Sequence, residues 1–242
     1  MNALDTKEIS RVRFQNVSSF GHNVVSTPIL VSASEDGLAC VFDTTQPSEE
    51  TALQNVLSVQ SPIREVGFFG PQSDAIYCLT GDETLKLFHK DNSVCQKDFG
   101  QQLRPYLSSK FPSDPNSAFS IDYLVDCQWD YSRQELLLLA GNANGDSGLF
   151  QVTEQDIALV SNLRGGHRGV IRSWIPLTPS IFVTVGEDAR MCEWNRLSQQ
   201  IKDGRKATEI IVASSRKRTG VEPKAGGGKI RRPRSRLTQR PY

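Results

Sequence analysis

Residues 165–195 read GGHRGVIRSWIPLTPSIFVTVGEDARMCEWN, three short apolar runs separated by turn residues. The stretch opens with Gly166-His167, passes through Gly186-Glu187-Asp188 and closes with Trp194-Asn195. Short runs rich in Val, Ile and Phe, bounded by Gly, Pro, Ser and Asp, are typical of β-strands. The stretch therefore predicts three antiparallel strands joined by tight turns.

The same order of features recurs three times upstream of this stretch. In each case a turn residue is followed six positions later by an aromatic residue that ends a strand. The four pairs are Asp36–Phe42, Asp82–Phe88, Asn144–Phe150 and Asp188–Trp194. The pairs are separated by 46, 62 and 44 residues, and the longest interval contains a Pro-rich stretch. Such spacing is typical of repeat proteins with one four-stranded sheet per repeat.

Alternating and apolar runs predict where the strands of each repeat lie. We expect four repeats, at residues 9–60, 61–100, 119–164 and 165–196. A polar segment, residues 1–8, precedes them, and residues 100–118 are expected to form a loop insert. The fourth repeat has no clear outer strand after its last aromatic residue.

These features resemble the WD-repeat β-propeller family, in which Gly-His and Trp-Asp bracket about 40 residues. Here Asn195 replaces the final Asp, and the resemblance covers about residues 9–196. It implies an all-β fold of about four four-stranded blades within residues 9–203. In this family a turn Asp, the His, a strand Ser or Thr and the Trp form a hydrogen-bonded set within a blade. The matching residues are His167, Thr184, Asp188 and Trp194, with partial sets at Ser32, Asp36 and Asp82.

A carboxylate, an imidazole and a hydroxyl also make up a hydrolase triad. Thr184, however, does not occupy the sharp strand-to-helix turn that exposes a catalytic nucleophile. A structural role is expected instead, because buried polar groups need hydrogen-bond partners. The five cysteines form no close pairs and are expected to be reduced thiols. We expect no enzyme activity, cofactor, metal site or small-molecule substrate.

The number of repeats leaves three interpretations of how a ring would close. WD-repeat propellers usually close with about seven blades, and an open arc would expose apolar faces and unpaired strand edges. The chain could be the C-terminal part of a seven-bladed ring, which is the interpretation we favour. It could also be a half-ring completed by a partner or a second copy, or a small closed ring of four or five blades.

The last residues differ sharply in charge from the rest. Residues 201–242 contain 13 Lys and Arg but 3 Asp and Glu, a net charge of +10, whereas residues 1–200 carry −9. The low apolar content of residues 204–242 predicts a disordered tail. Its basic clusters suit nuclear import or nonspecific contact with RNA or acidic proteins. They comprise Arg216, Lys217, Arg218, Lys229, Arg231, Arg232, Arg234 and Arg236.

The sequence thus favours an interaction protein over an enzyme. No apolar stretch resembles a signal peptide or reaches membrane-spanning length, so we expect an intracellular protein with no membrane partner, more nuclear than cytoplasmic. The main hypothesis is a non-catalytic scaffold for protein–protein interactions, with residues 100–118 as the favoured contact loop. The alternative is a nuclear or nucleolar assembly factor whose basic tail contacts RNA or acidic partners.

Overall fold

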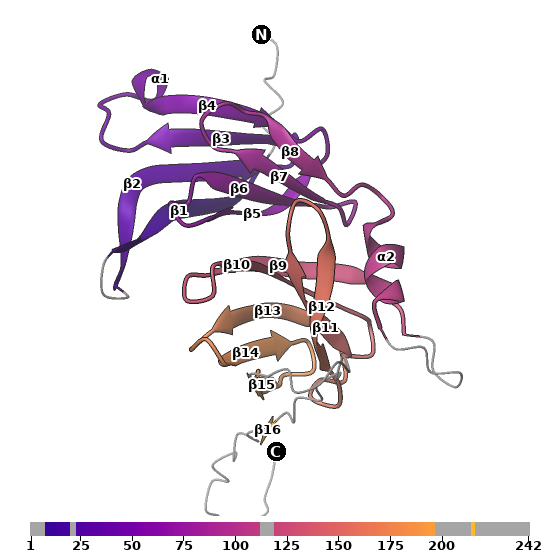
Figure 1. Cartoon of the computed structure of the whole chain (residues 1–242). Coiled ribbons are helices and arrows are strands. Elements are labelled where there is room, and N and C mark those ends of the chain that lie inside the picture. Colours follow the sequence, from indigo (N-terminus) through magenta and orange to yellow (C-terminus); the bar gives the residue numbers. More distant parts are fainter. Residues whose placement is uncertain (1–7, 20–22, 112–118, 197–213, 216–242) are drawn as a thin grey trace, which may run out of the picture.

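The computed structural model describes residues 8–19, 23–111, 119–196 and 214–215, which form four antiparallel four-stranded sheets (Figure 1). In every sheet the strands lie side by side in chain order. The first sheet contains β1 (Ile9–Ser19), β2 (Asn23–Ser34), β3 (Leu38–Asp43) and β4 (Leu53–Ser58). The second contains β5 (Ile63–Phe69), β6 (Ala75–Thr80), β7 (Leu85–His89) and β8 (Cys95–Asp98).

The third sheet contains β9 (Tyr123–Asp130), β10 (Glu135–Gly141), β11 (Ser147–Val152) and β12 (Ile157–Leu163). The fourth contains β13 (Ile171–Pro176), β14 (Ile181–Gly186), β15 (Met191–Asn195) and β16 (Ser214–Ser215). The four sheets are arranged as the blades of a β-propeller, which confirms the predicted fold class. We number the blades in chain order.

The outer strand of the fourth blade corrects one expectation. β16 pairs antiparallel with β15, with Glu193 opposite Ser214 and Cys192 opposite Ser215. The fourth repeat therefore does have an outer strand. Two serines carry no apolar pattern, so no periodicity in the sequence identifies them as a strand. They lie within the predicted tail, whose remaining residues are outside the described part of the chain.

The predicted loop insert contains a helix. α2 (Leu103–Ser109) has two leucines, Leu103 and Leu107, one helical turn apart, and both are buried. Pro105 stands at the third helical position, where a missing N–H removes no intrahelical hydrogen bond. A short helix α1 (Glu49–Ala52) also precedes β4, and the Ser48 side chain accepts a hydrogen bond from its first turn.

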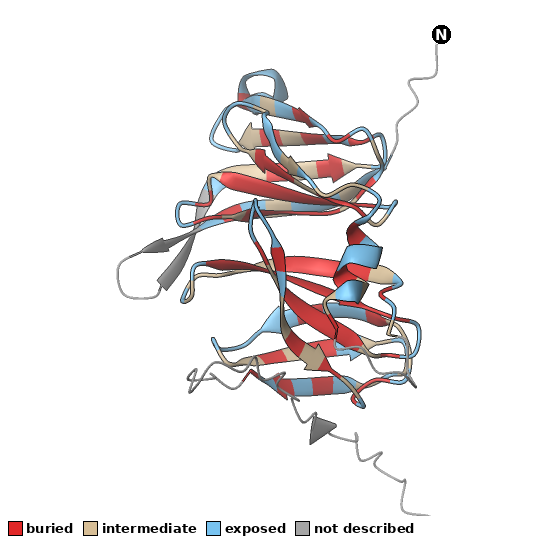
Figure 2. Cartoon of the chain, turned by 45° about the vertical axis from the view of Figure 1, so that its right-hand side comes forward, coloured by how far each residue is buried: buried red, intermediate tan, exposed pale blue. Residues whose placement is uncertain are grey.

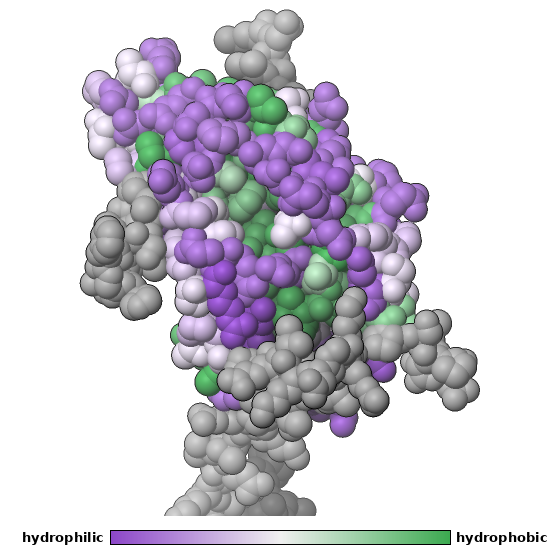
Figure 3. All heavy atoms as spheres, viewed as in Figure 1, coloured by the Kyte–Doolittle hydropathy of each residue, from purple (hydrophilic) through white to green (hydrophobic). Residues whose placement is uncertain are grey.

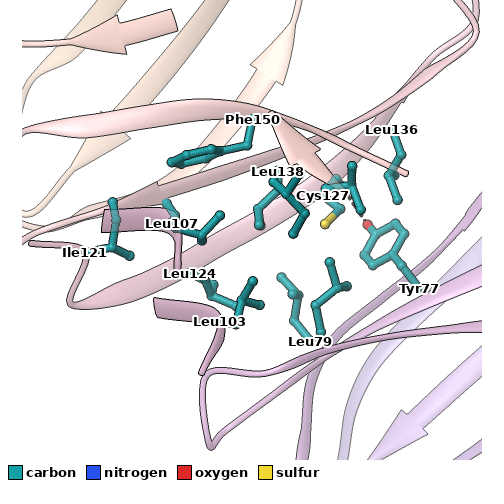
Figure 4. Close-up of a cluster of buried hydrophobic side chains, with 14 of the residues drawn as sticks. Tyr77, Leu79, Leu103, Leu107, Ile121, Leu124, Cys127, Leu136, Leu138 and Phe150 are labelled. Atoms are coloured by element: carbon teal, nitrogen blue, oxygen red, sulfur yellow. Dashed lines mark hydrogen bonds between the residues drawn. The ribbon is translucent and has the colours of Figure 1, made fainter. Parts of the chain in front are cut away.

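The hydrophobic core is divided among the contacts between consecutive blades. One cluster joins the first and second blades, and another joins the third and fourth. The cluster between the second and third blades includes Tyr77, Leu79, Cys127 and Phe150, together with the leucines of α2 (Figure 4). The helix therefore completes the core between two blades, so its position is fixed by burial of apolar surface.

Burial along the strands distinguishes the middle blades from the fourth. β6 and β10 are buried at every residue, whereas β15 alternates between exposed and buried residues (Figure 2). A strand that is covered on both faces is buried throughout, and a strand that is covered on one face alternates. The second and third blades are therefore covered on both faces.

Candidate functional site

The four residues predicted to act together in the fourth blade do lie together. His167 precedes β13, Thr184 is in β14, Asp188 is in the turn after β14, and Trp194 is in β15. Trp194 Nε1 donates to Thr184 Oγ1 at 2.7 Å, and Thr184 Oγ1 lies 2.8 Å from His167 Nε2. His167 Nδ1 lies 3.0 Å from Asp188 Oδ1.

If the His167 imidazole is neutral, only one arrangement of hydrogen atoms gives all four side chains their hydrogen-bond partners. An indole N–H can only donate, so Thr184 accepts from Trp194 and donates its hydroxyl hydrogen to His167 Nε2. The imidazole then carries its hydrogen on Nδ1 and donates it to the Asp188 carboxylate. In this arrangement each of the four side chains has a hydrogen-bond partner, as buried polar groups require.

Asp188 also fixes the backbone around its turn. Its carboxylate accepts from the backbone N–H groups of Arg168 and Arg190 at 2.8 and 3.1 Å. Burial acts to raise the pKa of Asp188, but these hydrogen bonds and the one from His167 outweigh it and hold that pKa below its usual value. The carboxylate therefore stays ionised as an acceptor at neutral pH.

The triad-like group has no face open to a substrate. Thr184 and Trp194 have no solvent exposure, and His167 has 3%. A nucleophile needs access to an electrophilic carbon, and the Thr184 hydroxyl instead lies between two side chains of its own blade. The arrangement is suited to joining β14, β15 and the preceding loop.

The other predicted network residues occupy simpler settings. Asp36 accepts from the Leu38 N–H at 2.8 Å within its own turn, and Asp82 accepts from the Ser61 hydroxyl at 2.5 Å. Ser32 lies in β2, opposite Cys40 of β3. Among the described residues, the complete four-residue set is found in the fourth blade alone. The eight basic tail residues proposed for nuclear import or nucleic-acid contact lie outside the described residues.

A second polar cluster joins the first three blades through their inner strands. Glu65 of β5 accepts two hydrogen bonds from the Arg11 guanidinium of β1, at 2.6 and 2.7 Å. Arg13 of β1 approaches both Glu65 and Asp126 of β9, at 3.5 and 4.0 Å. Tyr77 of β6 donates to Asp126 at 3.1 Å. The cluster thus links charged residues that are far apart in the sequence.

The protonation of Asp126 is unusual for a carboxyl group. Burial is the main cause, and the nearby Glu65 carboxylate adds to it, so the pKa of Asp126 rises to about 6. The sequence did not reveal this cluster, because its members belong to three different repeats. The available signal was a charged residue within the first strand of each of these repeats.

A groove on the outer rim lies between the second and third blades. It has a volume of about 270 Å³ and lies between β8, α2 and the turn that joins β11 to β12. Tyr106 of α2 hydrogen-bonds to Asp156 of that turn, and the Lys110 ammonium lies 4.3 Å from the centre of the Tyr106 ring. Lys97 is similarly placed 5.5 Å from the ring centre of Phe99. The groove therefore combines aromatic surface with two lysine side chains that lie over the aromatic rings.

Hydrophobic residues also reach the surface close to this region. Figure 3 shows hydrophilic residues over most of the face in view, with hydrophobic ones near its middle, where the second and third blades meet. Tyr106 itself is 39% exposed. The described residues include no cluster of His, Cys, Asp and Glu able to hold a metal ion. No helix in the described ranges is long and apolar enough to cross a membrane.

Comparisons with known proteins find similarity to WD-repeat proteins. No protein-family model matches the chain. The chain is 29% identical over 191 residues to the WD repeat-containing protein 89 homolog of Dictyostelium discoideum. The match covers 78% of this chain and 49% of that protein. It is also 29% identical over 203 residues to the WD repeat-containing protein GTS1 of Arabidopsis thaliana, covering 78% and 50% respectively. The chain thus spans about half the length of these relatives.

A solved structure agrees with the fold. The C-terminal WD40 domain of Sif2 superposes with a TM-score of 0.52 and 13% sequence identity, over 81% of this chain and 57% of that one. Identity at this level supports the fold and not a shared activity.

Proposed function

Since the chain is a WD-repeat protein with four β-propeller blades, we propose that it is a non-catalytic scaffold that binds other proteins. Propellers of this kind are rigid supports, and their function resides in the loops and rims that they present. The relatives are about twice as long as the matched region. The scaffold role is therefore proposed for this chain and not for the whole of a longer relative.

The rim groove is the observation that carries this proposal. Aromatic residues are enriched at protein interfaces, and Tyr is among the residues that contribute most to binding. Here Tyr106 and Phe99 line a concave surface whose support is rigid, because Leu103 and Leu107 are anchored in the core. A partner could therefore bind without reordering the helix, which lowers the entropic cost of association.

Replacement of Tyr106 tests the proposal. Tyr106→Ala removes exposed aromatic surface and one surface hydrogen bond, so the fold should lose less than about 1 kcal/mol. We expect proteins captured at stoichiometric levels by the wild-type chain to be lost from the variant, in quantitative affinity capture from cells. Gln54→Ala, at an exposed position of β4, is the matched control and should capture the same proteins. Equal capture by all three chains would contradict a role for the groove.

The charge asymmetry supports a second candidate, a nuclear or nucleolar assembly factor. A segment with net charge +10 attracts RNA and acidic proteins, and clustered Lys and Arg suit nuclear import. Residues 204–242 fused to a reporter should accumulate in the nucleus. A fusion in which the eight clustered Lys and Arg residues are replaced by Gln should stay evenly distributed. Even distribution of both fusions would exclude the tail as an import signal.

A further inference from the structure

The outer edges of the first and second blades are joined by hydrogen bonds. The outer strand β4 of the first blade lies against the turn that joins β7 to β8. Asn55 Nδ2 donates to the carbonyl of Lys90 in that turn at 2.7 Å. The Ser93 hydroxyl donates to the carbonyl of Val56 in β4 at 2.9 Å. The rim is therefore closed at this junction.

The equivalent place between the second and third blades is the rim groove. It is lined by Lys97 and Asp98 of β8, and by Gln155 and Asp156 of the turn that joins β11 to β12. Among the described residues, no hydrogen bond or ion pair joins β8 to this turn. Instead α2, which follows β8 in Figure 1, reaches the turn through the hydrogen bond from Tyr106 to Asp156. The rim is therefore open where the preceding junction is closed.

The rim groove does not depend on the two end blades. Every lining residue belongs to the second blade, the third blade or the segment between them. In this part of the chain Val94 and Tyr106 are the two large hydrophobic side chains that are substantially exposed, and Tyr106 lines the groove. An exposed tyrosine beside a concave surface is suited to anchor a partner.

The charges that line the groove leave one cation without a partner. Asp98 forms an ion pair with Lys86 at 3.1 Å, and Asp156 forms one with Lys110 at 3.3 Å. Lys97 has no carboxylate within 4.0 Å in the described part of the chain, and its ammonium lies over an aromatic ring. Because both lining carboxylates already have their cations, the charge left to be matched by a ligand is positive.

The strand that borders the groove also has an unpaired edge. β8 is the outermost strand of its sheet and pairs with β7. The outer edge of such a strand presents N–H and C=O groups with which an extended chain can pair. In that mode of binding the main chain supplies affinity, and alternate side chains of the peptide supply specificity.

We propose that the rim groove binds an extended peptide of a partner protein, with an Asp or Glu close to an aromatic or large apolar residue. The main chain of the peptide pairs with the edge of β8, and its carboxylate pairs with Lys97. Its apolar side chain packs against Tyr106 and Phe99. This inference rests on the proposed scaffold function and adds the chemistry of the partner.

Parallel selections from a displayed library of random short peptides test the proposal, with the full chain as bait. The wild type should enrich peptides that carry Asp or Glu close to an aromatic residue. Lys97→Glu should enrich Lys or Arg in place of the acidic residue, because the charge that faces the ligand is reversed. Residues 201–242, with a net charge of +10, attract acidic peptides to both baits equally. The difference between the two selections is therefore the readout.

Arg168→Glu is the matched control, since it makes the same change in net charge at an exposed position outside the groove. It should enrich the same peptides as the wild type. Fluorescence anisotropy should show that these peptides bind Lys97→Glu at least about tenfold more weakly than the wild type, because like charges then meet. Lys97→Arg should bind them about as well as the wild type. Circular dichroism melts identical to the wild type would show that each variant is folded.

Two results would overturn the acidic-peptide proposal. One is a library that yields no enriched peptide, and the other is an acidic preference that is the same for the wild type and Lys97→Glu. The scaffold function is judged separately by affinity capture with Tyr106→Ala. Loss of the captured proteins from that variant, together with selections that do not respond to Lys97, would leave the groove as a binding site for partners of different chemistry.

Discussion

The Thr184 hydroxyl occupies the centre of a chain of hydrogen bonds with no solvent exposure. It accepts from Trp194 and lies 2.8 Å from His167, whose other nitrogen faces Asp188. Buried hydrogen bonds contribute modestly when intact but are costly to break singly, because one partner is left unsatisfied. The set therefore makes the three elements of the blade depend on one another.

Asp188→Ala should destabilise the fold by about 1 to 3 kcal/mol, because it leaves the His167 N–H and two backbone N–H groups without their acceptor. Urea unfolding followed by tryptophan fluorescence measures this, since Trp174 and Trp194 are buried in the affected cluster. Asp36→Ala, which removes the acceptor of a single turn N–H at an exposed position, should cost less than about 1 kcal/mol. Equal losses in the two variants would argue against a cooperative set.

Asp126 predicts a pH dependence of stability. Its pKa in the folded chain is about 6, raised by burial and by Glu65, and opposed by hydrogen bonds from Tyr77 and from the backbone and by Arg13. Because the folded chain holds this proton more tightly than the unfolded one, the contribution is full below about pH 4 and is lost as pH rises through 6. The loss corresponds to about 2 to 3 kcal/mol.

Asp126→Asn should remove this contribution, since the amide cannot ionise. The free energy of unfolding of the variant, relative to wild type, should therefore rise between pH 4 and pH 7 in urea titrations. The Tyr77 hydrogen bond can be kept, because the amide oxygen still accepts. Parallel curves for the two chains would show that Asp126 is ionised throughout that range.

At the scale of the elements, turns decide how the blades meet. Gly145 lies in the turn between β10 and β11 with a φ of 89°, a region that favours glycine. A Cβ at this position would lie 2.6 Å from the carbonyl carbon of His167, in the loop that enters the fourth blade. The turn of one blade is thus packed against the loop of the next with no room for a side chain.

Gly145→Ala should accordingly cost at least about 2 kcal/mol, from backbone strain and from displacement of the His167 loop. Gly165→Ala separates the two causes, because Gly165 also has a positive φ, of 76°, but nothing lies within 4 Å of its added Cβ. That control should lose about 1 kcal/mol. Thermal unfolding of both variants measures the difference in stability. Equal losses would mean that the His167 loop moves aside at no cost in free energy.

Elements differ in how far the sequence could predict them. The strands β13, β14 and β15 were predicted within residues 165–195, because turn residues and apolar runs mark their ends. α2 was predicted as a loop, since three prolines obscured the single leucine pair that anchors it. β16 carries no apolar pattern at all, so its strand conformation depends on pairing with β15 and not on its own residues.

The two polar sites differ in the same way. His167, Thr184, Asp188 and Trp194 were predicted from one repeat of about 30 residues. The cluster of Arg11, Glu65 and Asp126 depends on how three repeats pack, which local spacing does not encode. Sequence patterns thus describe each blade, whereas contacts between blades require the structure.

At the scale of the whole molecule, the chain combines an acidic body with a basic end. Residues 1–200 carry a net charge of −9 and residues 201–242 carry +10. Opposite charges within one chain attract each other, and salt screens that attraction beyond about 10 Å at 0.1 M. Any polyanion that binds the basic end must compete with the acidic body, and the competition weakens as salt is added.

Binding to single-stranded RNA should therefore be nonspecific and steeply dependent on salt. If all eight clustered Lys and Arg side chains contact phosphates, the slope of log affinity against log salt should be about −6. Affinity should then fall about a thousandfold between 50 and 200 mM salt, as measured by fluorescence anisotropy. A chain with the order of residues 204–242 scrambled should bind equally well, because charge and not sequence is recognised. Affinity that does not change with salt, or that is lost on scrambling, would show that a specific structure and not the charge of this segment binds the RNA.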